Sequence, residues 1–294
     1  MITASPREDR VLTAIFLMLV TFFFFSSMDT IAKILVTSDI PAMQVAFTRY
    51  LSHFAFVFLV YFPRHGVRIF QSRTPRIQAL RAIALLSSTV FNFAALAYLP
   101  LTVTTAIFFA SPLAVCLLSI PILNEHIGIR RLSAVFVGFI GVVVITQAWN
   151  ANFHWAMFMS LAAFLSASTY FVLTRKIAGI DNNSVTQIYA SGFATIVLAP
   201  VAFFVWTTPA SALEWGLLFL IGILGAVGHS LLTLAHRFAQ ASTLAPLVYV
   251  QIIYITTFSW IFFNTAPDFW TIVGTGIIVA SGLYIWLRES RAPA

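Results

Sequence analysis

Long apolar stretches recur along the chain, each followed by a short polar or proline-containing break. A helix needs roughly 20 mostly apolar residues to cross the ~30 Å hydrocarbon core of a bilayer, and each stretch has about that length. The longest connection, 63–78, is too short to fold as a separate soluble domain. The pattern therefore predicts an all-α integral membrane protein with ten transmembrane helices, near residues 11–36, 42–62, 79–99, 102–122, 132–149, 153–175, 184–206, 214–236, 243–263 and 269–287.

The composition indicates the same class of protein. Of the 294 residues, 60% are hydrophobic and only 9% are charged, whereas an ordinary soluble domain carries about 25% charged residues. The first apolar stretch shows no small-residue cleavage site at its end, so we expect it to be retained as a span rather than removed as a signal peptide. The single cysteine, Cys116, lies in an apolar run and cannot form an intramolecular disulfide.

The basic residues predict the orientation of the helices. If the N-terminus is cytoplasmic and the spans alternate, 14 of the 16 Lys and Arg residues fall on the cytoplasmic side, and the other two, Lys33 and Arg49, lie in or at the ends of spans. Cytoplasmic loops of membrane proteins are enriched in Lys and Arg. This distribution accounts for the net charge of +7 without nucleic-acid binding, and it predicts a multi-pass inner-membrane protein with both termini in the cytoplasm. The 14 residues are Arg7, Arg10, Arg64, Arg68, Arg73, Arg76, Arg81, Arg130, Arg131, Arg175, Lys176, Arg237, Arg288 and Arg291.

The chain divides near residues 149–153 into two halves of five spans, 1–149 and 150–294. At an offset of 140 residues, the stretches 99–145 and 239–285 share a hydropathy profile and are identical at Ser119/Ser259, Asn124/Asn264 and Ile145/Ile285. Because each half has an odd number of spans, the second half must cross the membrane in the opposite direction to the first. We therefore predict two inverted repeats, an arrangement in which secondary transporters hold the substrate near mid-membrane between the repeats.

Several segments resemble a known family. Residues 80–102, LRAIALLSSTVFNFAALAYLPLT, and 108–127, FFASPLAVCLLSIPILNEHI, resemble the first half of the drug/metabolite transporter superfamily, EamA type. Residues 242–252, STLAPLVYVQI, and 281–289, SGLYIWLRE, resemble its ninth and tenth helices. The resemblance implies ten helices, cytoplasmic termini and export of small metabolites, with aromatic and other amino acids as the leading substrate class. An acidic residue that commonly ends the fourth span is kept as Glu125, whereas the ninth span ends in Asn264, which puts in doubt any gate that needs acids in both halves.

Four ionisable residues fall inside the first two predicted spans, where a charge is costly unless it is paired or hydrated. The hairpin between these spans centres near residue 39, so Asp29 and Arg49 should lie at the same depth, and Lys33, one turn from Asp29, could pair with the same carboxylate. These three residues are interpreted either as a structural ion pair or as a gate or substrate-carboxylate site. His53, one turn after Arg49, either couples transport to protons or hydrogen-bonds a backbone carbonyl.

Polar side chains in the other spans are candidates for the lining of a substrate cavity. Ser111 precedes Pro112, whose missing N–H frees a carbonyl, and His229 follows a set of glycines whose spacing is typical of close helix packing. Such groups can bind the ammonium and carboxylate of an amino acid, and aromatic rings can hold its side chain. Each could instead bond a neighbouring helix. The candidates are Ser88, Asn92, Ser111, Ser166, Tyr170, His229, Tyr249, Thr256 and Trp260, the last three on one stripe at helical spacing.

No sequence motif points to a different chemistry. The chain has no Gly-x4-Gly-Lys-Ser/Thr phosphate loop, no His/Cys/acid cluster with metal spacing and no Gly-x-Ser-x-Gly elbow. We therefore predict no catalytic residue, metal or cofactor, and we expect the lipid bilayer and a small molecule such as an amino acid as partners. An intramembrane enzyme acting on a lipid or isoprenoid is the alternative, and the coupling ion and oligomeric state stay open.

Overall fold

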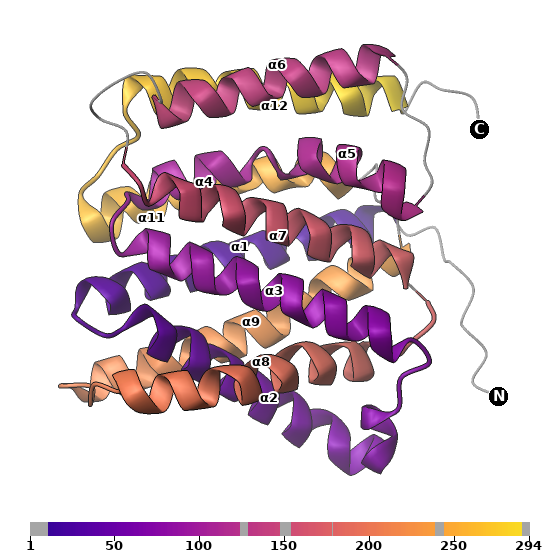
Figure 1. The fold of residues 1–294 in the computed structure, drawn as a ribbon, viewed down its shortest axis with the longest axis vertical. Helices are drawn as coiled ribbons and strands as arrows, with labels where there is room; N and C mark the ends of the chain where they lie inside the picture. The colour runs from indigo at the N-terminus through magenta and orange to yellow at the C-terminus, as the bar shows by residue number, and fades with distance from the viewer. Residues whose placement is uncertain (1–10, 124–128, 148–153, 178, 239–243, 290–294) are drawn as a thin grey trace.

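The computed structural model describes residues 11–123, 129–147, 154–177, 179–238 and 244–289, and every regular element in these ranges is a helix (Figure 1). The first part of the chain forms α1 (Val11–Thr37), α2 (Ala42–His65), η1 (Gly66–Phe70), α3 (Pro75–Leu96), α4 (Leu101–Phe108), α5 (Ser111–Leu123) and α6 (Ile129–Thr146). The second part forms α7 (Met157–Lys176), α8 (Asn183–Val205), α9 (Ala212–Phe238), η2 (Ala245–Val250), α11 (Gln251–Phe263) and α12 (Phe269–Glu289). Glu125, Arg130 and Arg131, like the residues at both chain ends, belong to parts whose side chains lie outside the described residues.

Seven helical segments of the described chain are long and apolar enough to cross a membrane, and three further apolar helices are shorter. Many large apolar side chains point outward, including Phe203 at 81% and Phe204 at 85% exposed, which suits contact with lipid rather than water. An all-helical membrane protein is therefore supported, while the exact count of ten spans and their division into repeats remain predictions. The seven long segments are Leu12–Thr37, Ala42–Phe70, Pro75–Leu96, Leu101–Ile122, Met157–Lys176, Asn183–Val205 and Ala212–Ala235; the shorter ones are Leu132–Thr146, Leu247–Phe263 and Phe269–Tyr284.

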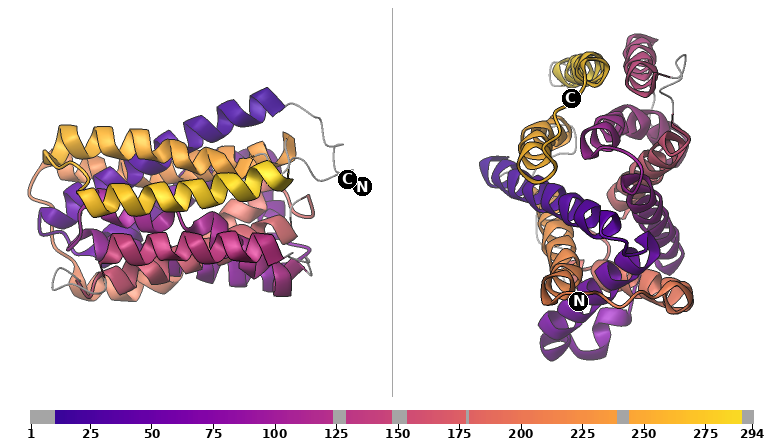
Figure 2. Two further views of the ribbon diagram at one scale, coloured as in Figure 1. Left: turned by 90° about the horizontal axis from the view of Figure 1, so that it is seen from above. Right: turned by 90° about the vertical axis from the view of Figure 1, so that its left-hand side faces the viewer.

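Helices from the first half of the chain pack mainly against helices from the second half. The main partners are α1 with α9, α2 with α8 and α9, α3 with α7, and α6 with α12. In Figure 1 the α6–α12 pair lies along one edge of the molecule, and the end-on view of Figure 2 shows the same pair at the edge of the bundle. Gly141 and Gly274 meet within this pair, since a Cβ atom at Gly274 would lie 2.6 Å from the Gly141 carbonyl oxygen. Their lack of side chains lets the two backbones approach closely.

The start of α1 and the end of α12 lie at the same end of the bundle (Figure 2), as an even number of crossings requires. We call this the terminal end; the connection between α2 and α3 and the one between α7 and α8 also lie there. The connection between α1 and α2 lies at the opposite end. Which end faces the cytoplasm remains a prediction.

The fourth predicted span, 102–122, is not one continuous helix. α4 ends at Phe108, a turn of two residues follows, and α5 begins at Ser111 with Pro112 in its first turn. Proline cannot donate to the preceding turn and its ring clashes with that turn, which explains the break. The predicted span 243–263 is also irregular, because it starts as the 3-10 helix η2 and becomes α-helical only at Gln251.

Candidate functional site

A buried arginine lies between the helices of the bundle. Arg49 on α2 is 1% exposed, and its guanidinium carbon lies 4.3 Å from the centre of the Tyr50 ring. Its Nη2 atom donates to Nε2 of His229 on α9 at 3.1 Å, and its Nε atom lies 3.2 Å from the sulfur of Met28 on α1. The third nitrogen, Nη1, is buried and has no hydrogen-bond partner in the described part of the chain. Because an unbonded buried donor is unfavourable, this atom marks a place for an acceptor.

Glycines on α9 bring that helix against α2 and α1. A Cβ atom at Gly222 would lie 2.5 Å from the Arg49 carbonyl oxygen, and one at Gly228 would lie 2.7 Å from the Phe25 ring. A Cβ atom at Gly225 would touch the Arg49 guanidinium itself, 3.6 Å from Nε. The close packing predicted from the glycine spacing is therefore present, and it positions His229 beside the guanidinium.

Asp29 on α1 lies at the depth of Arg49, in agreement with the hairpin geometry, since the neighbouring Met28 contacts the guanidinium. Its half-buried carboxylate accepts a hydrogen bond from Nδ2 of Asn92 on α3 at 3.0 Å, and the Arg49 charge acts on it electrostatically. Within the described residues the two groups form no direct ion pair. The structural ion pair expected from the sequence is thus absent. Nη1 of Arg49 and Oδ2 of Asp29 both remain available to a ligand.

The predicted pairing of Lys33 with Asp29 is wrong. Lys33 Nζ donates instead to the backbone carbonyl oxygens of Leu96 at 2.7 Å and Leu99 at 2.9 Å. α3 ends at Leu96, and the last carbonyls of a helix lack partners within it and carry partial negative charge. The ammonium group hydrogen-bonds carbonyls at this end, so Lys33 caps the C-terminal end of α3.

A chain of hydrogen bonds leads from Arg49 through His229 to α7 and α3. Arginine can only donate, so Nε2 of His229 accepts and the neutral ring carries its proton on Nδ1. Nδ1 lies 3.3 Å from the hydroxyl of Tyr170 on α7, which also accepts from Nη2 of Arg81 on α3 at 3.2 Å. His53 stacks on the His229 ring with centroids 6.0 Å apart, and in the described chain neither of its ring nitrogens is hydrogen-bonded. The bond from His53 to a backbone carbonyl, one of the two expectations, is therefore absent.

Arg81 extends this chain of hydrogen bonds towards the terminal end. The side chain is fully buried and donates from Nε to Oγ1 of Thr174 and from Nη1 to Oε1 of Gln78, both at 2.7 Å. Nε2 of Gln78 then donates to the carboxylate of Asp181 at 3.0 Å. Arg81 is thus a buried part of the bundle, and its assignment to the cytoplasmic side of the membrane stays a prediction. Arg81 lies inside the predicted span 79–99, and this position could have identified it as a candidate from the sequence.

Asp181, in the connection between α7 and α8, holds two loops together. Besides Gln78, its carboxylate accepts hydrogen bonds from Oγ of Ser72 at 2.6 Å, the backbone N–H of Arg73 at 2.9 Å and Oγ1 of Thr74 at 3.1 Å. Burial alone would raise the pKa of Asp181, but these hydrogen bonds outweigh burial and hold the pKa below its usual range. Sequence reasoning missed Asp181 because an acid in a short polar loop is ordinarily solvated.

We call the central group the polar centre. It includes six of the predicted candidates and links α1, α2, α3, α7 and α9. In the described chain, no group of three or more His, Cys, Asp and Glu side chains is placed to hold a metal ion. Ser88 is buried on α3, one turn before Asn92, beside this group. The polar centre comprises Asp29, Arg49, His53, Asn92, Tyr170 and His229.

Two further candidates lie at the break between α4 and α5. The ring of Phe109, the first residue of the turn between α4 and α5, packs edge-on against Tyr249 with centroids 6.0 Å apart. Ser111 Oγ and the Tyr249 hydroxyl are both buried and unbonded within the described residues. The carbonyl oxygen of Ser111 accepts from Oγ of Ser168 on α7 at 3.4 Å, so the start of α5 is hydrogen-bonded to α7.

The predicted stripe of Tyr249, Thr256 and Trp260 does not face one cavity. Tyr249 is buried and Thr256 is half-buried, but Trp260 is 68% exposed on the outside of α11. The predicted stripe assumes 3.6 residues per turn throughout, whereas the 3-10 helix η2 has 3.0 residues per turn. The buried face of α11 therefore carries Ile255 and Ser259. Trp260 is therefore wrong as a cavity residue. Thr256, and Ser166 on α7, which is also half-buried, remain predictions.

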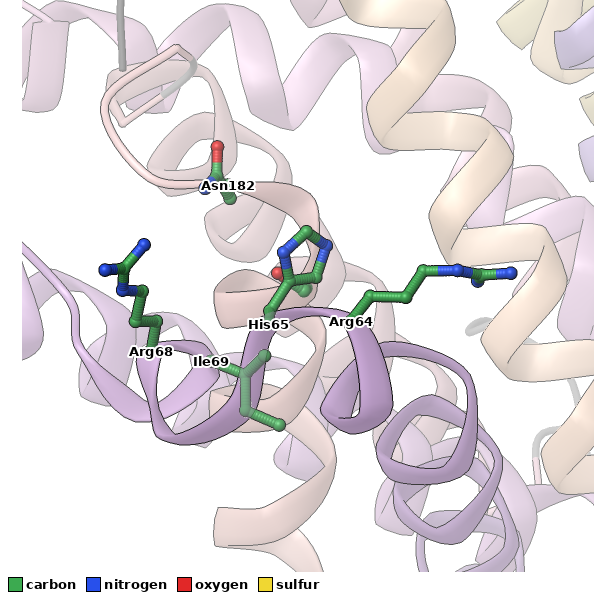
Figure 3. A pocket seen from close by; sticks show the side chains of 6 residues that line it. Arg64, His65, Arg68, Ile69 and Asn182 are labelled. Atoms are coloured by element: carbon green, nitrogen blue, oxygen red, sulfur yellow. The ribbon is translucent and has the colours of Figure 1, made fainter. Parts of the chain in front are cut away.

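A hollow of about 310 Å³ lies at the terminal end, where α2 runs into η1 (Figure 3). Its position on the surface separates it from the polar centre, whose hydrogen-bonding atoms are buried. We call it the basic hollow, because two arginines and a histidine contribute to its lining of Arg64, His65, Arg68, Ile69, Asn182 and Ser184.

Proteins of known activity are similar to most of this chain. The S-adenosylmethionine uptake transporter of Rickettsia prowazekii is 28% identical over 265 residues, covering 90% of this chain and 89% of that protein. The riboflavin transporter of Rhizobium johnstonii is 26% identical over 258 residues, covering 86% and 85%. The pseudopaline exporter CntI of Pseudomonas aeruginosa is 26% identical over 275 residues, covering 93% and 95%. These relatives are named for both uptake and export, and for three different small molecules.

The fold also matches a solved crystal structure with a TM-score of 0.68, covering 96% of this chain and 100% of that one. The sequence identity is 16%, so this likeness supports the fold alone. Two stretches of the chain, residues 12–147 and 154–287, each match the EamA-like transporter family. The family resemblance seen in the sequence is thereby confirmed, and the relatives are transporters rather than enzymes. The chain belongs to the EamA-like transporter family and is a multi-pass membrane transporter of a small molecule.

Proposed function

We propose that this protein is a secondary transporter that exports a small solute with an amino-acid-like carboxylate and ammonium group. The observation that carries the proposal is the buried, unbonded Nη1 atom of Arg49 close to the half-buried carboxylate of Asp29. Charged side chains at membrane depth are costly, and they mark substrate or ion pathways. Here one cation and one anion lie at the same depth, each with hydrogen-bonding capacity to spare.

Arg49 suits the carboxylate end of such a solute. Met28 and His229 hold two of its nitrogens, which fixes the plane of the guanidinium and leaves Nη1 to donate. Hydrogen bonds between a guanidinium and a carboxylate are charge-assisted and among the strongest in proteins. Asp29 suits the ammonium end, because Asn92 occupies Oδ1 and leaves Oδ2 as an acceptor.

Aromatic rings beside these charges support an aromatic or hydrophobic amino acid as the substrate. The Phe25 ring lies 4.8 Å from the His229 ring, and the Tyr170 ring packs edge-on against His229 at 5.7 Å. Aromatic faces hold apolar and aromatic ligand groups by stacking and burial.

The proposed architecture is ten spans in two inverted repeats, residues 1–149 and 150–294, with cytoplasmic termini. The two family matches fall one within each repeat. The fourth span of each repeat is irregular, as the break between α4 and α5 and the 3-10 start of α11 demonstrate. Interrupted helices in corresponding positions of two repeats are a feature of transporter substrate sites.

Alternating access requires the bundle to open at one end at a time. In this structure the polar centre is closed, and hydrogen bonds join α2 and α3 to the second half at both ends. At the terminal end these are the bonds to Asp181. At the opposite end the Gln44 side chain donates to the Thr207 carbonyl at 2.7 Å and accepts from the Thr207 N–H at 2.8 Å. We infer that the hydrogen bonds at each end of the bundle break when that end opens.

The proposal is tested by reconstituting the purified protein into liposomes loaded with one amino acid and measuring counterflow of labelled external solutes. We expect labelled aromatic or hydrophobic amino acids to accumulate unchanged, and protein-free liposomes to give no signal. S-adenosylmethionine and riboflavin belong in the panel because relatives are named for them. Movement of riboflavin alone would refute the amino-acid assignment. A chemically altered lipid with no solute movement would instead support the intramembrane enzyme.

Direction is tested separately in growing cells that overproduce the protein. On plates containing toxic amino-acid analogues, an exporter gives resistance, whereas an importer gives hypersensitivity. Hypersensitivity would contradict export while leaving the amino-acid assignment intact.

A further inference from the structure

We propose that the basic hollow binds the phosphate-bearing headgroup of an anionic phospholipid. The hollow lies where α2 leaves the bundle, and Figure 3 shows His65 and Arg68 extending on the side that faces Asn182 at the start of α8. The proposal depends on the membrane location of the protein. It does not depend on the solute or the direction of transport.

The walls of the hollow are held in place by the fold. Gly66 ends α2 with a φ of +54°, a left-handed conformation that glycine adopts without strain, and the chain turns there into η1. Ile69, 1% exposed, packs η1 onto the bundle. The Tyr189 hydroxyl on α8 donates to the Phe70 carbonyl at 3.2 Å and fixes the far end of η1. The hollow is therefore built before any ligand arrives.

The charges around the hollow suit a phosphate. Arg64 and Arg68 contribute two permanent positive charges, and guanidinium groups bind phosphate oxygens through paired hydrogen bonds. Nη1 of Arg64 also donates to the Val60 carbonyl at 3.3 Å, and Figure 3 shows this side chain extending away from Asn182, so Arg68 is the nearer of the two cations to the start of α8. Asp181 is the neighbour of Asn182 in the chain, but its carboxylate already accepts four hydrogen bonds from residues 72–78. The positive charge of the hollow thus has no acidic partner in the described lining.

The apolar surroundings favour a lipid over a free phosphate. Beside the cations, Phe62 is 36% exposed, Val67 is 67% exposed and Phe70 is 43% exposed, all at the end of a membrane helix. Acyl chains would cover these side chains, whereas inorganic phosphate would gain nothing from them. A general attraction between basic loops and anionic lipid also exists, so the test must separate a built site from that background.

The test is native mass spectrometry of the full-length protein in detergent, titrated with phosphatidylglycerol or with phosphatidylcholine. We expect phosphatidylglycerol to stay bound preferentially. The double variant R64Q/R68Q should lose about tenfold in affinity, a loss of the size expected for charge-assisted bonds. The matched control is R76Q, because Arg76 is also exposed near the terminal end but does not line the hollow.

Three results would overturn the proposal: equal retention of the two lipids, equal losses in R64Q/R68Q and R76Q, or displacement of the lipid by an equal concentration of inorganic phosphate. The substituted side chains are exposed, so we expect the variant to fold, and its thermal unfolding is compared with that of R76Q. If R64Q/R68Q fails to fold, the single variant R68Q replaces it, with a smaller loss expected. If R64Q/R68Q no longer binds the lipid but still transports solute, the lipid site is independent of the polar centre.

Discussion

Arg49 and His229 are separated by 180 positions in the chain and share a hydrogen bond of 3.1 Å that joins α2 to α9. The bond orients one edge of the guanidinium towards the protein and leaves Nη1 on the other side. It also requires a neutral His229, whose remaining N–H points to Tyr170. Side chains of α1, α9 and α7 are thereby coupled to a single charged group on α2.

Replacing Arg49 by lysine should abolish most transport while preserving the fold. Lysine keeps the positive charge but lacks the planar fork, so it cannot bond His229, contact Met28 and donate to a carboxylate at once. We expect the initial rate of counterflow to fall at least about tenfold, the effect of losing roughly 1.4 kcal/mol. Folded yield and thermal unfolding in detergent should stay near those of the wild type. The control is R76K, and a wild-type rate in R49K would refute the role given to Arg49.

Replacing Asp29 by asparagine should change which solutes compete for transport. The amide keeps an acceptor for Asn92 but removes the negative charge that the substrate ammonium would meet. We expect amino acids to compete about tenfold more weakly, and the corresponding carboxylic acids without an amino group to compete as before. The measurement is inhibition of labelled-solute counterflow, with exposed Asp39→Asn as the control. An equal loss for both solute classes would argue that Asp29 is only structural.

Adding a methyl group at Gly222 should disturb the polar centre through the backbone. The new Cβ atom would lie 2.5 Å from the Arg49 carbonyl oxygen, so α9 must move away from α2. Overpacking of this kind costs about 1–3 kcal/mol, and we expect a lower unfolding temperature together with slower transport. Gly216→Ala, in the same helix, is the matched control because its Cβ would have no neighbour within 4 Å. Equal behaviour of the two variants would contradict the close packing.

Removing the Asp181 carboxylate should destabilise the protein at neutral pH and matter less in acid. Because the native pKa of Asp181 is lowered, its stabilising effect is fully present above the pKa of an unfolded aspartate, about 3.9, and is lost as the pH falls through the native value. We expect D181A to unfold at a lower temperature than the wild type at pH 7. The difference between the two unfolding temperatures should narrow as the pH is lowered. Thr74→Val, which removes one of the four donors, should give a smaller effect of the same sign. A difference in unfolding temperature that does not change with pH would exclude the charge of Asp181 as its cause.

Features that depend on local periodicity could be predicted from the sequence. The apolar stretches predicted the helices, the hairpin count predicted the common depth of Asp29 and Arg49, and the glycine spacing predicted the close approach of α9. Each of these follows from residue spacing along one or two adjacent helices. The candidate list accordingly held six members of the polar centre before their contacts were known.

Features that depend on which distant helices meet could not be predicted. The partners of Lys33 are backbone carbonyls that become available only where α3 ends. Arg81 reaches Tyr170 on another helix, and no spacing rule connects them. Trp260 was misplaced because a short 3-10 segment changed the phase of the helix before it. A pattern within one segment carries no information about these neighbours.

The pairing of first-half helices with second-half helices has a consequence for biosynthesis. α1, α2, α3 and α6 each find their main packing partner among helices that the ribosome makes later. The first-half helices therefore wait in the bilayer without the histidine partner of Arg49, since the helix that carries His229 has not yet been translated. Assembly of the polar centre is therefore a late event, because it must wait until α9 has been made and has entered the membrane.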